Sequence, residues 1–151
     1  FFLTEGDRLI PWVGKTAKMM GYFISDGLKE NGIDLSKEQF LMLMFLRKEQ
    51  GCNQNQLAFF TNRSKTSLTR MIQTLEKKAY VYRCVSDSDK RNNHVHLTEQ
   101  GEEILERAIP VVVSLIEEVQ TGIDKSELHT PIKVMEQILT NIHNRTSYNK
   151  S

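Results

Sequence analysis

The stretch from Ser64 to Lys78, SKTSLTRMIQTLEKK, decides the fold expected for this chain of 151 residues. At 3.6 residues per turn, four apolar side chains of the stretch fall on one face of a helix. Ser64 suits the cap, because its hydroxyl can accept a hydrogen bond from an unpaired N–H of the first turn. The stretch therefore predicts a helix whose apolar stripe faces a core, formed by Leu68, Met71, Ile72 and Leu75.

The exposed start of this helix has the residue types of a DNA-reading helix. Small donors and acceptors suit base edges and phosphates, and arginine can make a bidentate contact to guanine. A solvated surface helix with ordinary capping is the alternative for the stretch taken alone. The candidate contact residues are Ser64, Lys65, Thr66, Ser67, Thr69 and Arg70.

The preceding segments predict two more helices. Ser36 and Gln39 fit a capping box for a helix that runs to about Lys48. Residues 53–56, NQNQ, form a second capping signal before a short helix and a tight turn at 61–63. Two short helices with a basic start to the second indicate a helix-turn-helix. In the first of these helices the residues expected to point inward are Phe40, Leu41, Leu43, Met44 and Leu46.

The following segment predicts a β-hairpin. Residues 80–85 are rich in strand formers, and residues 93–97 alternate polar and apolar side chains as a half-buried strand does. The polar stretch between them carries Lys90 and Arg91, which could reach a phosphate or a narrow minor groove. A hairpin directly after a helix-turn-helix is a wing.

Long amphipathic helices flank this module, and they have more apolar surface than it can cover. We expect them to meet a second copy of the chain as a two-fold homodimer. The predicted fold is mainly α with a small β-hairpin wing, a winged helix-turn-helix flanked by long dimerisation helices. We expect one domain over residues 1–151, with the DNA-binding part at about 36–98 and the dimerisation helices in 1–35 and 99–145.

The charge distribution favours a polyanion as partner. The net charge is only +1, but residues 53–98 hold eight lysines and arginines against three acidic residues. A basic middle between acidic flanks is the electrostatic pattern of a nucleic-acid-binding module. The apolar runs are too short for a membrane span, and no signal peptide is evident, so the expected location is cytoplasmic.

Residues 36–105 resemble the winged helix-turn-helix core of the multiple antibiotic resistance regulator (MarR) family. The most specific piece is Asp89-Lys90-Arg91, followed by Val95, Leu97, Thr98 and Gly101, which is similar to the family's D-x-R, V-x-L-T, x-x-G signature. The start of the 64–78 helix is similar to the family's recognition helix. The resemblance implies a homodimeric bacterial transcription factor, usually a repressor, that a ligand or oxidation releases from a palindromic operator.

The resemblance also implies roles for single residues. Lys65, Thr66, Ser67, Thr69 and Arg70 would contact the major groove of double-stranded operator DNA. Arg91, oriented by Asp89, would lie at or beside the minor groove; the alternative is that this pair only staples the hairpin. Ala79 departs from the pattern, because the family usually has glycine there. An alanine must adopt a left-handed conformation at some cost or end the helix differently.

Other chemistries are alternatives with less support. We find no nucleophile elbow, no phosphate-binding glycine loop and no nucleotide motif, so we expect no enzyme activity and no cofactor. His94 and His96 share one face of a strand, but no third metal ligand is evident locally, and we expect no metal site. The alternative is that His129 or His143 approaches them in the fold. A winged helix that docks an acidic protein is a further alternative.

The signal sensed by such a regulator is a separate question. Cys52 and Cys84 match no metal or redox spacing, and each is more typical of a small buried residue than of a thiol switch. We expect a small lipophilic or aromatic effector instead, because aromatic and methionine side chains line adaptable apolar pockets. The candidate pocket residues, for which plain core packing is the alternative, are Trp12, Met19, Met20, Phe23 and Phe40.

Overall fold

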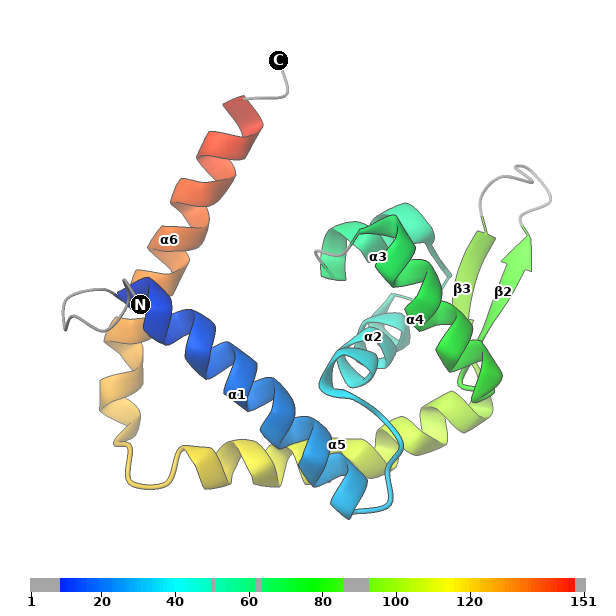
Figure 1. Ribbon diagram of the computed structural model, residues 1–151, viewed down its shortest axis with the longest axis horizontal. Helices are drawn as coiled ribbons and strands as arrows, with labels where there is room; N and C mark the ends of the chain where they lie inside the picture. Colours follow the sequence, from blue (N-terminus) through cyan, green and yellow to red (C-terminus); the bar gives the residue numbers. More distant parts are fainter. Residues whose placement is uncertain (1–8, 50, 62–63, 86–92, 149–151) are drawn as a thin grey trace. The chain divides into compact units, whose positions relative to one another are not determined.

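The computed structural model describes residues 9–49, 51–61, 64–85 and 93–148. The described part is mostly helical with one small antiparallel sheet (Figure 1). This confirms the expected fold class. The elements are α1 (Leu9–Glu30), α2 (Lys37–Lys48), β1 (Cys52–Asn53), α3 (Gln54–Thr61), α4 (Lys65–Lys77), β2 (Val81–Val85), β3 (Asn93–Leu97), α5 (Glu99–Val119), a 3₁₀ turn η1 (Lys125–Leu128) and α6 (His129–Tyr148).

The chain divides into two compact units, one up to Leu115 and the other from Ile116 onward. The first unit contains the hydrophobic core, in which α3 and α4 pack against each other and α2 packs against β3. Burial of this apolar surface is the main favourable term for folding. The core side chains that solvent does not reach include Leu28, Met42, Leu43, Leu46, Leu57, Ile72, Leu75, Val95 and Leu105.

Local side-chain caps begin α2 and α3 of the first unit, as the sequence predicts. The Ser36 hydroxyl accepts from the Gln39 N–H, and the Gln39 side chain accepts from the Ser36 N–H, which completes the capping box. The same reciprocal pattern joins Asn53 and Gln56 at the start of α3. Such caps satisfy backbone donors that a helix start leaves unpaired.

One expectation about this unit is wrong, and one strand was missed. Leu41 and Met44 of α2 are exposed, whereas Met42 is fully buried. Apolar residues follow one another almost without a break in this helix, so the sequence offers no clear period from which to choose the buried face. The sheet also has a third strand that was not expected: β1 pairs with β3, and the strand order is β1-β3-β2.

The second unit contains the end of α5, the turn η1 and the helix α6. Asp124 and Glu127 form a capping box that begins the 3₁₀ turn η1, directly before α6. None of the described residues of this unit is buried. Its exposed large apolar side chains are Ile116, Ile123, Ile132, Val134, Leu139 and Ile142.

Candidate nucleic-acid interface

The helix α4 is anchored by one face and capped at its start. Leu68, Ile72 and Leu75 are buried in the core, and Met71 packs against it. The Ser64 hydroxyl accepts a hydrogen bond from the Ser67 N–H at 3.3 Å, as predicted. The buried stripe fixes which side chains of α4 face solvent.

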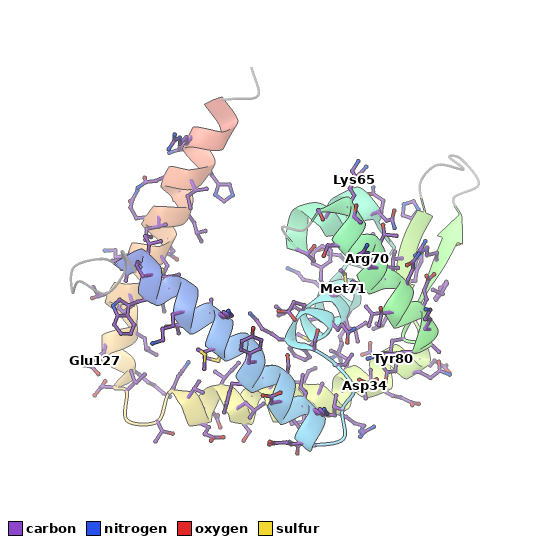
Figure 2. All side chains as sticks on the ribbon, viewed as in Figure 1. Asp34, Lys65, Arg70, Met71, Tyr80 and Glu127 are labelled. Atoms are coloured by element: carbon purple, nitrogen blue, oxygen red, sulfur yellow. The ribbon has the colours of Figure 1, made fainter. Side chains whose placement is uncertain are left out.

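The opposite face of α4 presents polar and cationic side chains. Lys65, Thr66 and Arg70 are exposed, whereas Ser67 and Thr69 are half-buried. Lys65 lies at the start of the helix and Arg70 further along it (Figure 2). The structure gives neither Lys65 nor Arg70 an ion pair within the described residues, so both cations are available to an anion. Gln73, one turn beyond Arg70, is also exposed and was missed by the sequence analysis; its i+3 spacing from Arg70 is the signal that could have found it.

Two threonines of α4 donate their hydroxyl protons within the helix. Thr69 donates to the Lys65 carbonyl at 2.8 Å, and Thr74 donates to the Arg70 carbonyl at 2.9 Å. These bonds hold the side chains in one rotamer while leaving the hydroxyl oxygens able to accept. In this arrangement Thr69 can therefore accept a hydrogen bond from a base edge.

The hairpin lies beside α4 in the first unit (Figure 1). The strands β2 and β3 are antiparallel, with pairs from Val81 opposite Leu97 to Val85 opposite Asn93. Asp89, Lys90 and Arg91, the residues expected at the wing tip, lie outside the described residues. Their roles therefore stay predictions.

An ion pair that the sequence analysis missed joins the hairpin to α4. Nη2 of Arg83, in β2, lies 3.0 Å from a carboxylate oxygen of Glu76. The Arg83 side chain is 24% exposed and shares its face of β2 with the buried Val81. A cation on the inner face of a strand needs a partner, and this alternation was the available signal.

The junction between the hairpin and α5 explains part of the Thr98–Gly101 pattern. The Thr98 hydroxyl donates to the Ala79 carbonyl at 2.6 Å, and it accepts from the Gly101 N–H at 2.9 Å. A Cβ at position 101 would overlap the backbone carbonyl oxygen of Tyr80. Ala79 has φ +58°, so it takes the left-handed conformation and α4 ends without glycine. Thr98 and Gly101 thus fasten the end of α4 to the start of α5.

The two cysteines differ in their surroundings. Cys52 is buried, and its thiol donates to the Glu49 carbonyl. Burial, with a smaller contribution from the charge of Glu49, raises the pKa of the Cys52 thiol, which disfavours the reactive thiolate. Cys84 is exposed on β2, contrary to the expectation of a buried residue.

The two histidines of β3 have different described surroundings from those of a metal site, and one of them stacks on a tyrosine. His96 stacks on Tyr82 with ring centroids 5.2 Å apart. Among the described residues, no group of three or more His, Cys, Asp and Glu side chains is placed to hold a metal ion.

The residues expected to line an effector pocket differ in their exposure to solvent. Trp12 and Met19 are exposed, Met20 and Phe23 are half-buried, and Phe40 belongs to the core. A surface cavity of about 660 Å³ lies elsewhere, and none of the five lines it. It is lined by Ser25, Asp26, Lys29, Gly32, Ile33, Asp34, Leu35, Ser36, Gln39 and Lys78.

The helices that the structure describes include none with the length and apolar character needed to cross a membrane.

Comparisons with known proteins agree with this geometry. Residues 35–92 match the sequence model of the MarR family. An uncharacterised HTH-type transcriptional regulator of Bacillus cereus is 28% identical over 136 residues, which cover 90% of this chain and 84% of that protein. The transcriptional repressor MprA of Escherichia coli is 24% identical over 115 residues, covering 76% of this chain and 65% of MprA. The crystal structure of the S. aureus MepR–DNA complex shares the fold with a TM-score of 0.81, at 20% identity, over 90% of this chain and 99% of that chain.

Proposed function

The chain belongs to the MarR family of transcriptional regulators, and on that premise we propose that it is a homodimeric, ligand-responsive repressor of a palindromic operator. One observation carries the proposal. The buried stripe of α4 leaves Lys65, Thr66 and Arg70 exposed along its N-terminal half, and neither cation has an ion pair with any residue that the structure describes. A helix held by one face and cationic at its start suits a major groove.

The exposed apolar surface supports the dimer. In the first unit, Ile10, Trp12 and Met19 of α1 are exposed, and in the second unit so are Leu139 and Ile142 of α6. Large apolar patches on a soluble chain mark surfaces that a partner covers. A two-fold dimer would present two copies of α4, and half-sites one DNA turn apart would require about 34–36 Å between them.

The repressor role is supported by a relative, whereas the effector is proposed from the residues of this chain. MprA is a transcriptional repressor, and the likeness of this chain to it supports the same outcome here. An effector that prefers another spacing of the two α4 helices would weaken operator binding in proportion to its differential affinity. The residues proposed to contact the effector remain Trp12, Met19, Met20, Phe23 and Phe40. The raised pKa of Cys52 favours a small molecule over a switch at this thiol.

Fluorescence anisotropy tests the proposal. Purified protein is titrated against a labelled duplex from the intergenic DNA beside its own gene, at several salt concentrations. We expect tight binding that a scrambled duplex does not compete away, with log K falling by roughly 0.9 per neutralised phosphate for each unit of log salt. Weak binding, equal on all sequences, would contradict the proposal and would favour a winged helix that docks an acidic protein.

A further inference from the structure

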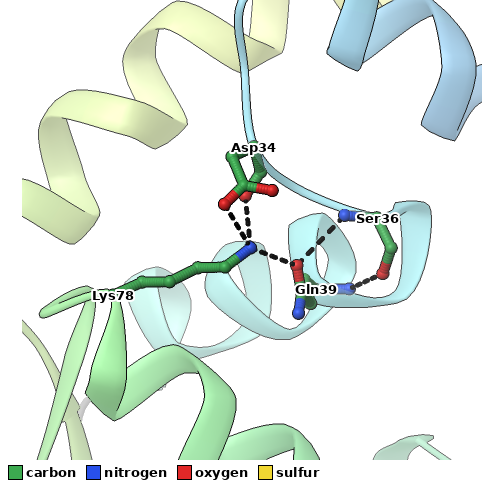
Figure 3. A network of polar contacts seen from close by, with 4 residues as sticks. All are labelled: Asp34, Ser36, Gln39 and Lys78. Carbon is green, nitrogen blue, oxygen red and sulfur yellow. Dashed lines mark hydrogen bonds and ion pairs between the residues drawn. The ribbon is translucent and has the colours of Figure 1, made fainter.

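The C-terminal end of α4 is held by a polar network that none of the DNA-facing residues joins. Lys78 follows the last residue of α4, and its ammonium group donates to the backbone carbonyl of Asp34 at 2.8 Å. The same group lies 2.9 Å from the Asp34 carboxylate and 3.4 Å from the side-chain oxygen of Gln39 (Figure 3). Asp34 lies in the loop between α1 and α2, so one side chain ties the end of α4 to the loop that follows α1.

The loop that receives Lys78 is itself fixed. Ile33 and Leu35, on either side of Asp34, are buried in the core. The side-chain oxygen of Gln39 that faces Lys78 also accepts from the Ser36 N–H at 3.1 Å. Lys78 therefore contacts the capping box that begins α2, and not a mobile side chain on the surface.

Hydrogen bonds continue this network into α1. The Lys37 N–H, in the first turn of α2, donates to the Ser25 hydroxyl at 2.9 Å, and this hydroxyl donates to the Gly21 carbonyl at 2.8 Å. Ser25 and Gly21 belong to α1. Bonded groups thus run from α1 through the start of α2 to the end of α4, all within the first unit.

The contacts of Lys78 differ in strength because they differ in exposure to solvent. The Asp34 side chain is 82% exposed, so its ion pair with Lys78 is screened by solvent and salt. The Lys78 side chain is only 22% exposed. Its bonds to a fixed backbone carbonyl and to Gln39 give it a defined position that does not depend on the exposed carboxylate.

From this geometry we infer that Lys78 is a positioning residue for DNA recognition, which sets the orientation of α4 relative to α1. The inference rests on the proposed function. The helix α4 has 13 residues and is about 20 Å long, so a tilt of about 5° at its clamped end moves its DNA-facing start by roughly 2 Å. Hydrogen bonds to base edges tolerate much less than this. A change in α1 can reach the operator contacts by this path.

The test compares specific and non-specific binding of full-length variants. Lys78→Met removes the donors and keeps an unbranched apolar chain, and Lys77→Met removes the same charge from the neighbouring exposed residue. Affinities are measured by anisotropy for the intergenic duplex and for its scrambled counterpart, at a temperature where circular dichroism shows each variant fully folded. The readout is the ratio of the two affinities, because partial unfolding or loss of charge lowers both together, whereas a misdirected helix lowers specific binding most.

We expect Lys78→Met to lower this ratio at least about fivefold, within the range of ordinary coupling between sites. Lys77→Met should leave the ratio unchanged, and Lys78→Arg, which restores charge and donors, should recover most of it. Asp34→Asn keeps the backbone carbonyl and should stay within about twofold of the unmodified protein, as expected for a screened pair.

An unchanged ratio in a folded Lys78→Met variant would overturn the inference, and so would an equal fall in Lys77→Met. If Lys78→Met does not fold, Gln39→Met answers the same question, since it removes the acceptor shared by Lys78 and Ser36. A smaller fall in the ratio is then expected, and no fall would again overturn the inference. Absence of specific binding by the unmodified protein would instead refute the proposed function.

Discussion

Ala79 takes the left-handed backbone conformation, which a glycine at the same position would adopt without strain. Its φ of +58° is unfavourable for any residue with a Cβ, and the Ala79 carbonyl is held there by the Thr98 hydroxyl. We expect Ala79→Gly to raise the free energy of unfolding by about 0.5–1 kcal/mol, because relief of strain outweighs the greater freedom of glycine in the unfolded chain.

Thermal denaturation followed by circular dichroism measures this change, which corresponds to a rise in Tm of a few degrees. Ala17→Gly is the matched control, since Ala17 is exposed in the interior of α1. It should lower stability by about 1 kcal/mol. A lower Tm for Ala79→Gly would show that the left-handed residue carries no strain worth removing.

The cysteines supply a second prediction at the scale of residues. Burial keeps Cys52 protonated to higher pH than an ordinary thiol, whereas Cys84 is exposed. We expect iodoacetamide at mildly alkaline pH to alkylate Cys84 well before Cys52 in the folded protein, as measured by mass spectrometry of peptides. Raising the pH should speed the Cys52 reaction only above the range where an ordinary thiol ionises. In urea the two should react at similar rates, and faster reaction of Cys52 in the folded protein would contradict the structural assignment.

Single residues also show what the sequence could reveal. The role of Ser64 as a cap depends on neighbours within a few positions and was foreseen. The left-handed conformation of Ala79 was one of two alternatives that the sequence left open. Lys78 and Asp34 are 44 positions apart, and nothing local to either indicates the contact. Arg83 could be flagged as a cation on an inner strand face, but its partner Glu76 becomes evident only when β2 lies against α4.

At the scale of elements, substitutions in α4 distinguish contacts to bases from contacts to phosphates. We expect Arg70→Ala to weaken operator binding by roughly 1–3 kcal/mol and to relax the preference at one base pair. Arg70 is exposed and anchored to the helix by no described contact, so its loss should leave the fold intact. Anisotropy on a set of duplexes with single base changes measures both effects.

Lys65→Ala provides the comparison on the same helix. A lysine at the helix start that contacts phosphate should, when removed, weaken all duplexes alike and reduce the salt slope by about one. An equal loss on every duplex for Arg70→Ala as well would assign Arg70 to a phosphate and leave the base contacts to its neighbours.

The elements themselves were predictable to different degrees for physical reasons. α4 and the two hairpin strands have local sequence signals, and their bounds agree closely with the expected ranges 64–78, 80–85 and 93–97. β1 has only two residues, Cys52 and Asn53, and no pattern of its own; it exists because β3 offers a free edge. The burial of α2 depends on which neighbours surround it, so Leu41 and Met44 could not be assigned from the helix alone.

At the scale of the whole molecule, the proposed dimer makes the final prediction. Leu139 is exposed on α6, and we expect Leu139→Asp to place a charge in the apolar contact between two copies. The unmodified protein should sediment with about twice its chain mass of 17.5 kDa, and the variant should shift towards a monomer and lose operator binding. Analytical ultracentrifugation over a range of concentrations measures the shift.

Asn144→Asp is the control, because it places a carboxylate at an exposed polar position of the same helix. This variant should remain dimeric. A monomeric unmodified protein, or a Leu139→Asp variant that associates as before, would contradict the proposed use of α6.

The buried residues that the structure describes lie in the first unit only, and this has a consequence for how repression depends on the amount of protein made. The first unit holds the core and α4, the proposed DNA-reading helix, whereas the described part of the second unit buries no side chain. Under the proposed dimer, newly made chains carry α4 before they are paired, and the fraction of chains that pairs rises with their concentration. While most chains are unpaired, the amount of dimer grows with the square of the chain concentration. Halving the synthesis of the protein would then cut the supply of competent repressor about fourfold, so transcription of its target would respond sharply to small changes in expression.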